Sequence, residues 1–144
     1  MDRADEAVAC FFRGFSCSQA VFLCYAKESG LDSRTALKLS CGFGAGIART
    51  GEICGAVSGA IMVIGLRHGR DTVEDKDARD TTYKIVQQFL ASFAERNGSV
   101  NCRELIGHDL SDPESYDRAA KSGVFTTKCP ALVRGAVEVL EEIL

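Results

Sequence analysis

The amino-acid sequence predicts an all-α fold: a compact bundle of about six to eight helices that forms a single domain over residues 1–144. Apolar side chains recur at spacings of three and four, which is the period of an amphipathic helix. Single glycines follow several of these segments, as expected of helix C-caps. No segment alternates apolar and polar residues long enough to form a half-buried strand, and no Asn-Gly or Asp-Gly turn joins candidate strands.

Glycine positions and apolar spacing together define the individual helices. The glycines expected to end helices in a left-handed conformation are Gly14, Gly30, Gly69, Gly98 and Gly123. The predicted helices cover residues 2–12, 16–29, 32–40, 54–68, 73–97, 101–107, 113–122 and 129–143.

Two of these predicted helices carry long apolar stripes. In the segment 73–97 the stripe is Tyr83, Val86, Phe89, Leu90 and Phe93. In the segment 129–143 it is Leu132, Val133, Ala136, Val137, Leu140 and Ile143. Both stripes are expected to pack on one core. Gly55 and Gly59, four residues apart on one helix face, would allow another helix to approach closely within or between chains.

Composition and charge exclude several classes of protein. Apolar residues make up 46% of the 144 residues and only two are proline, which indicates a globular chain. A net charge of −3 leaves no excess of positive charge for phosphates, so we expect no nucleic-acid partner. The longest apolar stretch, residues 56–66, is shorter than the roughly 18 residues of a membrane span. We therefore expect a buried helix there and no membrane association.

The cysteine content points to thiol chemistry in a reducing compartment. Seven cysteines among 144 residues are fewer than in a small secreted disulfide scaffold, and the odd number leaves at least one unpaired within the chain. The first ten residues are charged and do not resemble a secretory signal. We therefore expect a cytoplasmic protein, in which cysteines more often bind metals or carry out redox reactions than form structural disulfide bonds.

Four cysteines are predicted at helix starts. Ser16 and Gln19 form a capping box that places Cys17 in the first helical turn, and Asn101 and Glu104 repeat this pattern around Cys102. Cys54 follows a glycine-rich run and opens the next helix. Proline favours the first helical position, so Pro130 predicts that Cys129 is an N-cap.

A helix N-terminus favours the thiolate over the thiol, because unpaired N–H groups and the helix dipole stabilise an anion there. Cys17, Cys54, Cys102 and Cys129 are therefore the candidate reactive residues, with Cys17 or Cys54 as the attacking thiolate. Positive charge from Arg49, Arg103 and Lys128 would add to this effect. Taken singly, each cysteine is equally compatible with a small buried hydrophobe. Cys10, Cys24 and Cys41 are expected to be structural.

Other motifs are less specific. No Cys-x-x-Cys and no pair of His residues at zinc spacing is present, so a metal site would have to be assembled by tertiary contacts. The run 41–51 contains G-x-G-x-G, but the spacing and the preceding helix do not fit a dinucleotide-binding loop. We expect its glycines to let the backbone pass close to the thiols and present N–H groups to a thiolate or substrate. Arg49 in this run either holds an anion or is a surface charge.

The segments CSQAV at Cys17 and CGAVSG at 54–59, followed by the single Cys102 and Cys129, resemble the C_GCAxxG_C_C family. This family comprises small proteins classed as redox-active, with four cysteines and a CGAxxG element. The resemblance spans nearly the whole chain and implies redox-related thiol chemistry at the same four cysteines that helix capping selects.

The sequence therefore predicts a thiol-based redox protein with one dithiol/disulfide site formed by Cys17, Cys54, Cys102 and Cys129. It would act as a thiol-disulfide oxidoreductase on a small oxidised substrate or a redox partner protein, and the sequence identifies no cofactor for this reaction. The alternative is a metal-binding protein that holds zinc or an iron–sulfur cluster through the same cysteines. A third hypothesis is a helical interaction module whose cysteines only pack in the hydrophobic core. The apolar helix faces are also compatible with a homodimer.

Overall fold

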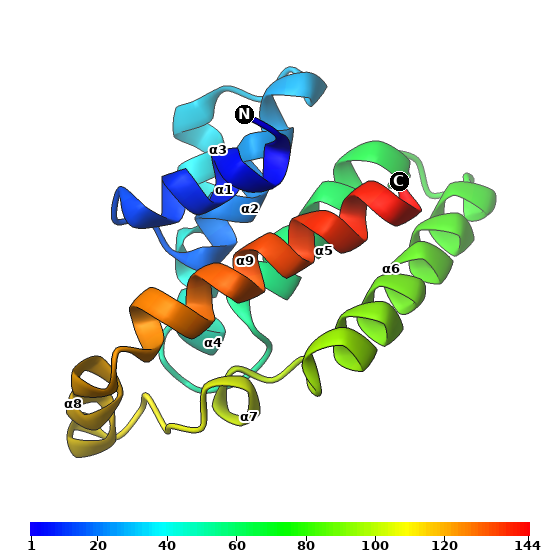
Figure 1. The fold of residues 1–144 in the computed structure, drawn as a ribbon. Coiled ribbons are helices and arrows are strands. Elements are labelled where there is room, and N and C mark those ends of the chain that lie inside the picture. Colours follow the sequence, from blue (N-terminus) through cyan, green and yellow to red (C-terminus); the bar gives the residue numbers. More distant parts are fainter.

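The computed structural model describes residues 1–144, and it confirms the all-α fold (Figure 1). No strand forms, and the only β-type pairing is an isolated antiparallel bridge between Ile53 and Asn101. No helix combines the length and apolar character needed to cross a membrane. The α-helical segments are α1 (Arg3–Phe12), α2 (Cys17–Ala26), α3 (Ser33–Ser40), α4 (Gly44–Ile47), α5 (Gly55–His68), α6 (Lys76–Asn97), α7 (Cys102–Ile106), α8 (Pro113–Ser122) and α9 (Val124–Ile143). Short 3-10 turns cover Lys27–Ser29 and Cys41–Phe43.

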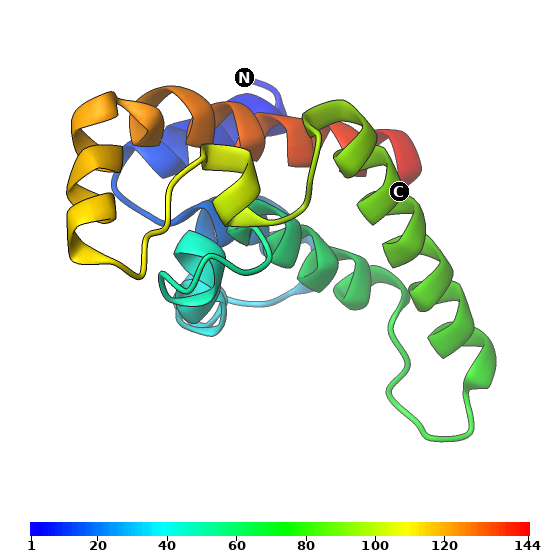
Figure 2. The same ribbon diagram turned by 90° about the horizontal axis from the view of Figure 1, so that it is seen from below.

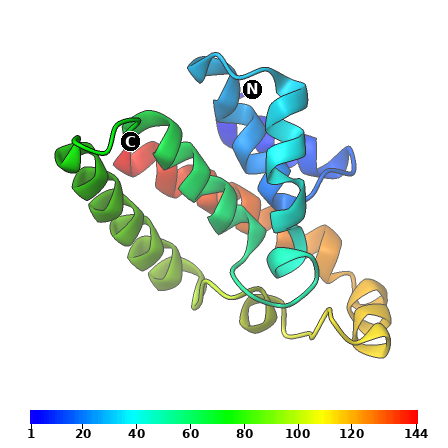
Figure 3. The ribbon, with the colours of Figure 1, turned by 180° about the vertical axis from the view of Figure 1, so that it is seen from behind.

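Helix α5 lies at the centre of the bundle. It packs against α2 on one side and α6 on the other, and α9 runs across the molecule beside it (Figures 1 and 3). Val57 and Ile64 of α5 are fully buried, as are Phe89 and Phe93 of α6, whose rings stack with centroids 5.9 Å apart. This core holds the N-terminal ends of α2 and α5 side by side.

Small residues on α5 allow α2 to come very close. A Cβ atom placed on Gly59 would lie 2.7 Å from the Ser18 carbonyl oxygen, and one on Gly55 would lie 2.5 Å from the Cys17 sulfur. Both distances are shorter than van der Waals contact. The close approach predicted from these two glycines is therefore confirmed within the chain, and it brings the backbone of α5 against Cys17.

Helix α9 begins earlier than the sequence predicted. It starts at Val124, directly after Gly123, which has a left-handed φ of +83° and ends α8. The hydroxyls of Thr126 and Thr127 both donate to the Gly123 carbonyl. Pro130 lies inside the helix rather than in its first turn, and the helix continues past it at the loss of one backbone hydrogen bond. The prediction that Cys129 is an N-cap is therefore wrong.

Two other local predictions differ from the structure. Gly69, which we expected to be left-handed, has φ −61° and ψ 147°, so it ends α5 in an extended conformation. Tyr83, predicted to lie on the buried stripe of α6, is 61% exposed. The first half of α6 extends away from the rest of the bundle, as Figure 2 shows, so this side chain has little core to pack against.

Segment α4 is one turn of left-handed helix. The φ angles are positive at five consecutive residues, 45–49, four of which are not glycine. The Ala48 N–H donates to the Gly44 carbonyl at 2.8 Å and closes the turn. Each non-glycine residue in this conformation costs about 1–2 kcal/mol, because its Cβ crowds the following carbonyl. Strain concentrated in one loop is typical of a functional site.

Replacing Ala48 by Gly is expected to stabilise the protein by about 1 kcal/mol. Ala48 is exposed and has φ +53° and ψ +44°, so the substitution removes the Cβ clash without removing core packing. Ala91→Gly is the matched control, because Ala91 is exposed in the middle of α6. This variant should lose about 1 kcal/mol of its free energy of unfolding. Urea unfolding measures both changes, and destabilisation by Ala48→Gly would contradict the left-handed turn.

Candidate functional site

The four predicted cysteines meet at one cavity. This cavity, called the thiol cavity below, has a volume of about 470 Å³. Its lining includes residues of α4, α7 and the start of α5. These elements come together at one end of the bundle (Figures 1 and 3). The cavity lining also includes the side chains of Cys17, Cys54, Cys102 and Cys129, and that of Cys41, which we had expected to be structural.

Cys17 has the strongest set of hydrogen-bond donors. It is the first residue of α2, and the predicted capping box is present, with the Ser16 hydroxyl accepting from the Gln19 N–H. Hydrogen bonding with the neighbouring Cys54 is the largest cause of the lowered pKa of Cys17. Backbone N–H groups of Ala45, Ser18 and Ala56 add to it, and together they outweigh burial and lower the pKa to about 6. Cys17 is therefore mostly a thiolate at pH 7.

Cys54 is the protonated partner in this pair. It is the N-cap of α5 and is only 4% exposed. The hydrogen bond that it donates to Cys17 holds its proton, so its pKa lies well above that of an ordinary thiol. Burial and the negative charge of Cys17 raise the pKa further. The pKa values of the two sulfurs are thus shifted in opposite directions, although both residues lie at helix starts.

Cys102 is brought to the cavity by backbone pairing that the sequence did not reveal. Its N–H donates to the Glu52 carbonyl, and the Cys54 N–H donates to the Val100 carbonyl, both at 2.8 Å. Cys102 begins α7 as predicted, but the Asn101 side chain makes no capping hydrogen bond. Burial, followed by the charge of Cys17, raises the Cys102 pKa to about 11.

Cys129 reaches the cavity from the interior of α9 rather than from a helix start. It therefore lacks the free backbone N–H groups of a helix N-terminus, which we had expected next to its sulfur. Burial raises its pKa to about 12, with contributions from the charges of Cys17 and Cys102. Position at a helix start thus coincides with a lowered pKa at only one of the four cysteines, Cys17.

The remaining cysteines fall into two groups. Cys10 is buried and Cys24 half-buried within α1 and α2, as expected, and burial raises the pKa of both, that of Cys24 to about 12. Cys41 is exposed at the rim of the thiol cavity. It directly follows Ser40, whose carbonyl accepts a hydrogen bond from the Ser18 hydroxyl, and this contact ties Cys41 to the start of α2. The one sequence signal for Cys41 was its place at the head of the glycine-rich run.

The glycine-rich run wraps around the thiols as predicted. A Cβ at Gly46 would lie 2.6 Å from the Cys102 Cβ, and one at Gly44 would lie 2.6 Å from the Ser16 Cβ. Gly46 also has a left-handed φ of +66°, a backbone conformation that glycine adopts more easily than other residues. This close passage places the Ala45 N–H on the Cys17 sulfur. Ala45 acts through its backbone, which explains why no side-chain motif identified it.

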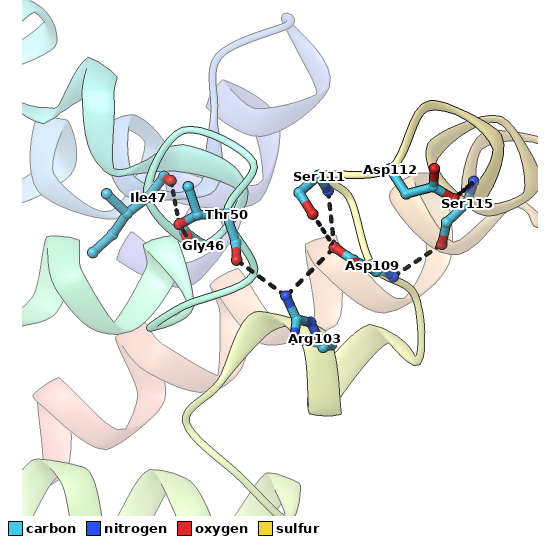
Figure 4. Close-up of polar contacts among 8 residues, drawn as sticks. All are labelled: Gly46, Ile47, Thr50, Arg103, Asp109, Ser111, Asp112 and Ser115. Carbon is cyan, nitrogen blue, oxygen red and sulfur yellow. Dashed lines mark hydrogen bonds and ion pairs between the residues drawn. The ribbon is translucent and has the colours of Figure 1, made fainter.

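Arg103 has a different role from the one predicted. Its guanidinium donates to the Thr50 carbonyl at 3.4 Å and pairs with Asp109 at 3.5 Å (Figure 4). The Thr50 hydroxyl in turn donates to the Gly46 carbonyl at 2.8 Å. Arg103 thus ties the loop that contains α4 to the segment between α7 and α8. The lowered pKa of Cys17 comes from thiol and backbone donors, not from basic side chains.

The arrangement of possible metal ligands bears on the metal-binding alternative. No group of three or more His, Cys, Asp or Glu side chains has a geometry that could hold a metal ion. The four cysteines share the thiol cavity without forming a tetrahedral set of ligands. Among them, Cys17 and Cys54 are the pair that shift each other's pKa most strongly, in opposite directions.

The fold and the cavity define a small helical protein with a paired thiolate and thiol beneath a strained loop. Residues 15–143 match the model of the family described as "Putative redox-active protein (C_GCAxxG_C_C)". The chain belongs to this redox-active cysteine protein family, as its sequence motifs indicated. No curated protein and no solved structure matches the chain.

Proposed function

We propose that the protein is a thiol-disulfide oxidoreductase in which Cys17 attacks and Cys54 resolves. The proximity of Cys17 to the start of α5 and the opposite pKa shifts of Cys17 and Cys54 carry this proposal, because they favour Cys17 as the nucleophile and Cys54 as the protonated second thiol. A thiol with a pKa near the ambient pH attacks disulfides most effectively. Cys102 and Cys129, both protonated, are the nearby thiols available for later exchange.

The reaction starts when the Cys17 thiolate attacks one sulfur of a substrate disulfide. A mixed disulfide forms, and the other substrate sulfur leaves with the electron pair and takes up a proton. Cys17 then no longer carries a negative charge or accepts the Cys54 proton, so the two contacts that raise the Cys54 pKa are lost. Cys54 ionises and attacks the Cys17 sulfur, which releases the second substrate thiol. The substrate gains two electrons and two protons, and Cys17 and Cys54 become a disulfide.

The dependence of Cys17 alkylation on pH tests this proposal. The rate of modification of Cys17 by iodoacetamide, followed by peptide mass mapping, should rise with pH to a midpoint near 6 and then level off. Cys54→Ala removes the donor, and the midpoint should rise by about one to two pH units, the worth of a hydrogen bond to a charged group. Cys54→Ser keeps a donor of similar position and should show a smaller rise.

Three results, from alkylation, disulfide mapping and metal analysis, decide the outcome. Mild oxidation should link Cys17 to Cys54, as mapped by mass spectrometry. An unchanged midpoint in Cys54→Ala would remove the basis of the proposal. Stoichiometric zinc or iron in freshly purified protein, with thiols that become reactive only after chelation, would instead establish the metal-binding alternative.

A further inference from the structure

The walls of the thiol cavity are apolar and partly aromatic. Thirteen of its nineteen lining residues are hydrophobic, and none is Asp or Glu. Phe11, Tyr116 and Phe125 provide aromatic surface, and the rings of Tyr116 and Phe125 lie 5.4 Å apart. The volume of about 470 Å³ is that of a site for a small molecule.

Arg49 is the only basic residue that lines the cavity. Its guanidinium lies 4.4 Å from the centre of the Tyr116 ring, and one of its nitrogens donates to the Tyr116 hydroxyl at 3.4 Å. No carboxylate pairs with it, although seven ion pairs form elsewhere in the protein. Arg49 closes the left-handed turn with φ +68°, a strained conformation for an arginine. The fold therefore places an exposed arginine without a carboxylate partner at the cavity, on a strained stretch of backbone.

The position of the sulfurs favours a small substrate over a protein disulfide. Cys17, the attacking residue, is half-buried, and Cys54, which must reach it, is 4% exposed. A disulfide in a folded partner would have to bring its backbone into the cavity to reach them. The N-termini of α2 and α5 also meet at the cavity, which adds positive potential to that of Arg49.

We infer that the substrate of the thiol cavity is a small, largely apolar disulfide that carries a carboxylate or another anionic group. This inference rests on the proposed function. The apolar part of the substrate lies against the aromatic wall, and its anionic group pairs with the free edge of the Arg49 guanidinium. Cys17 and Cys54 supply the two electrons that convert this disulfide to two thiols, and they become a disulfide themselves.

The test compares the rates at which the reduced protein reacts with three small disulfides. The probes are dithiobis-nitrobenzoate, which is aromatic and anionic, dithiodipyridine, which is aromatic and neutral, and dithiodipropionate, which is aliphatic and anionic. Each rate is divided by that of mercaptoethanol with the same probe, so that differences in intrinsic reactivity cancel. All proteins carry Cys41→Ser, which removes the exposed thiol at the rim.

Arg49→Gln should lower the preference for the anionic over the neutral aromatic probe by about tenfold, the worth of one charged hydrogen bond. The matched control is Arg34→Gln, which removes the same charge from an exposed position on α3 outside the cavity lining and should leave the preference unchanged. Both variants should still react faster with the aromatic anionic probe than with the aliphatic anionic probe.

An equal effect of both arginine substitutions would overturn the role of Arg49, because only overall charge would then matter. Equal normalised rates with the aromatic and aliphatic anions would overturn the apolar part of the inference. Both results would leave the proposed function intact. If instead Cys17→Ser reacts with all three probes as fast as the parent protein, the proposed function itself fails, and the inference fails with it.

Discussion

Cys17→Ser is expected to slow the reduction of a small disulfide at pH 7 by about fifty-fold or more when Cys41 has also been replaced by Ser. Cys17, with a pKa of about 6, is mostly ionised at this pH, whereas burial raises the pKa of Cys54, Cys102 and Cys129 even without the charge of Cys17. Cys102, with a pKa of about 11, is ionised in roughly one molecule in ten thousand. The greater nucleophilicity of the more basic thiolate offsets about two of these orders of magnitude. Stopped-flow measurement with a small aromatic disulfide gives the rate.

Cys24→Ser is the control for this loss of reactivity. Cys24 lies on the same helix as Cys17 but outside the thiol cavity, and burial raises its pKa to about 12. Its replacement should leave the rate unchanged within experimental error. A loss of rate in Cys24→Ser equal to that in Cys17→Ser would show that the effect comes from disturbing α2 and not from removing the attacking thiolate.

Gly59→Ala is expected to destabilise the protein by roughly 2 kcal/mol or more, since inserting a methyl group into a close-packed contact forces the two helices apart. The added Cβ would lie 2.7 Å from the Ser18 carbonyl oxygen and 3.2 Å from the Val21 Cβ. Because α2 also carries Cys17, the rate with small disulfides should fall together with the free energy of unfolding. Urea denaturation measures the change in stability.

Gly65→Ala provides a matched control on the same helix. A Cβ at Gly65 would meet no atom within 4 Å, so this substitution should stabilise α5 by about 0.5–1 kcal/mol. The two glycine substitutions are thus expected to have opposite signs. A neutral or stabilising effect of Gly59→Ala would contradict the close packing of α2 against α5.

Helix formation and the position of Cys17 could be predicted from the sequence because they depend on local interactions. The capping box of Ser16 and Gln19 involves residues within one helical turn, and the structure confirms it. The same reasoning was wrong at Cys129. Pro130 is tolerated in the interior of α9, which begins directly after Gly123. Proline only prefers the first helical turn, and the packing of the rest of α9 outweighs this preference.

The differences among the cysteines depend on contacts between residues far apart in the sequence. Cys17 and Cys54 both lie at helix starts, yet the pKa of Cys17 is lowered and that of Cys54 is raised because one accepts the other's proton. The Ala45 N–H reaches Cys17 only because the loop turns left-handed, which no residue pattern predicted.

Local spacing was therefore sufficient for most of the helices and for the helix starts at Cys17, Cys54 and Cys102, since capping and amphipathic periodicity operate within a few residues. Tertiary packing decided the rest: the inclusion of Cys41, the exclusion of Cys129 from a helix start, and the single unpaired charge of Arg49 at the cavity. Burial and hydrogen bonding act through space, so they set which sulfur is a thiolate and which remains protonated.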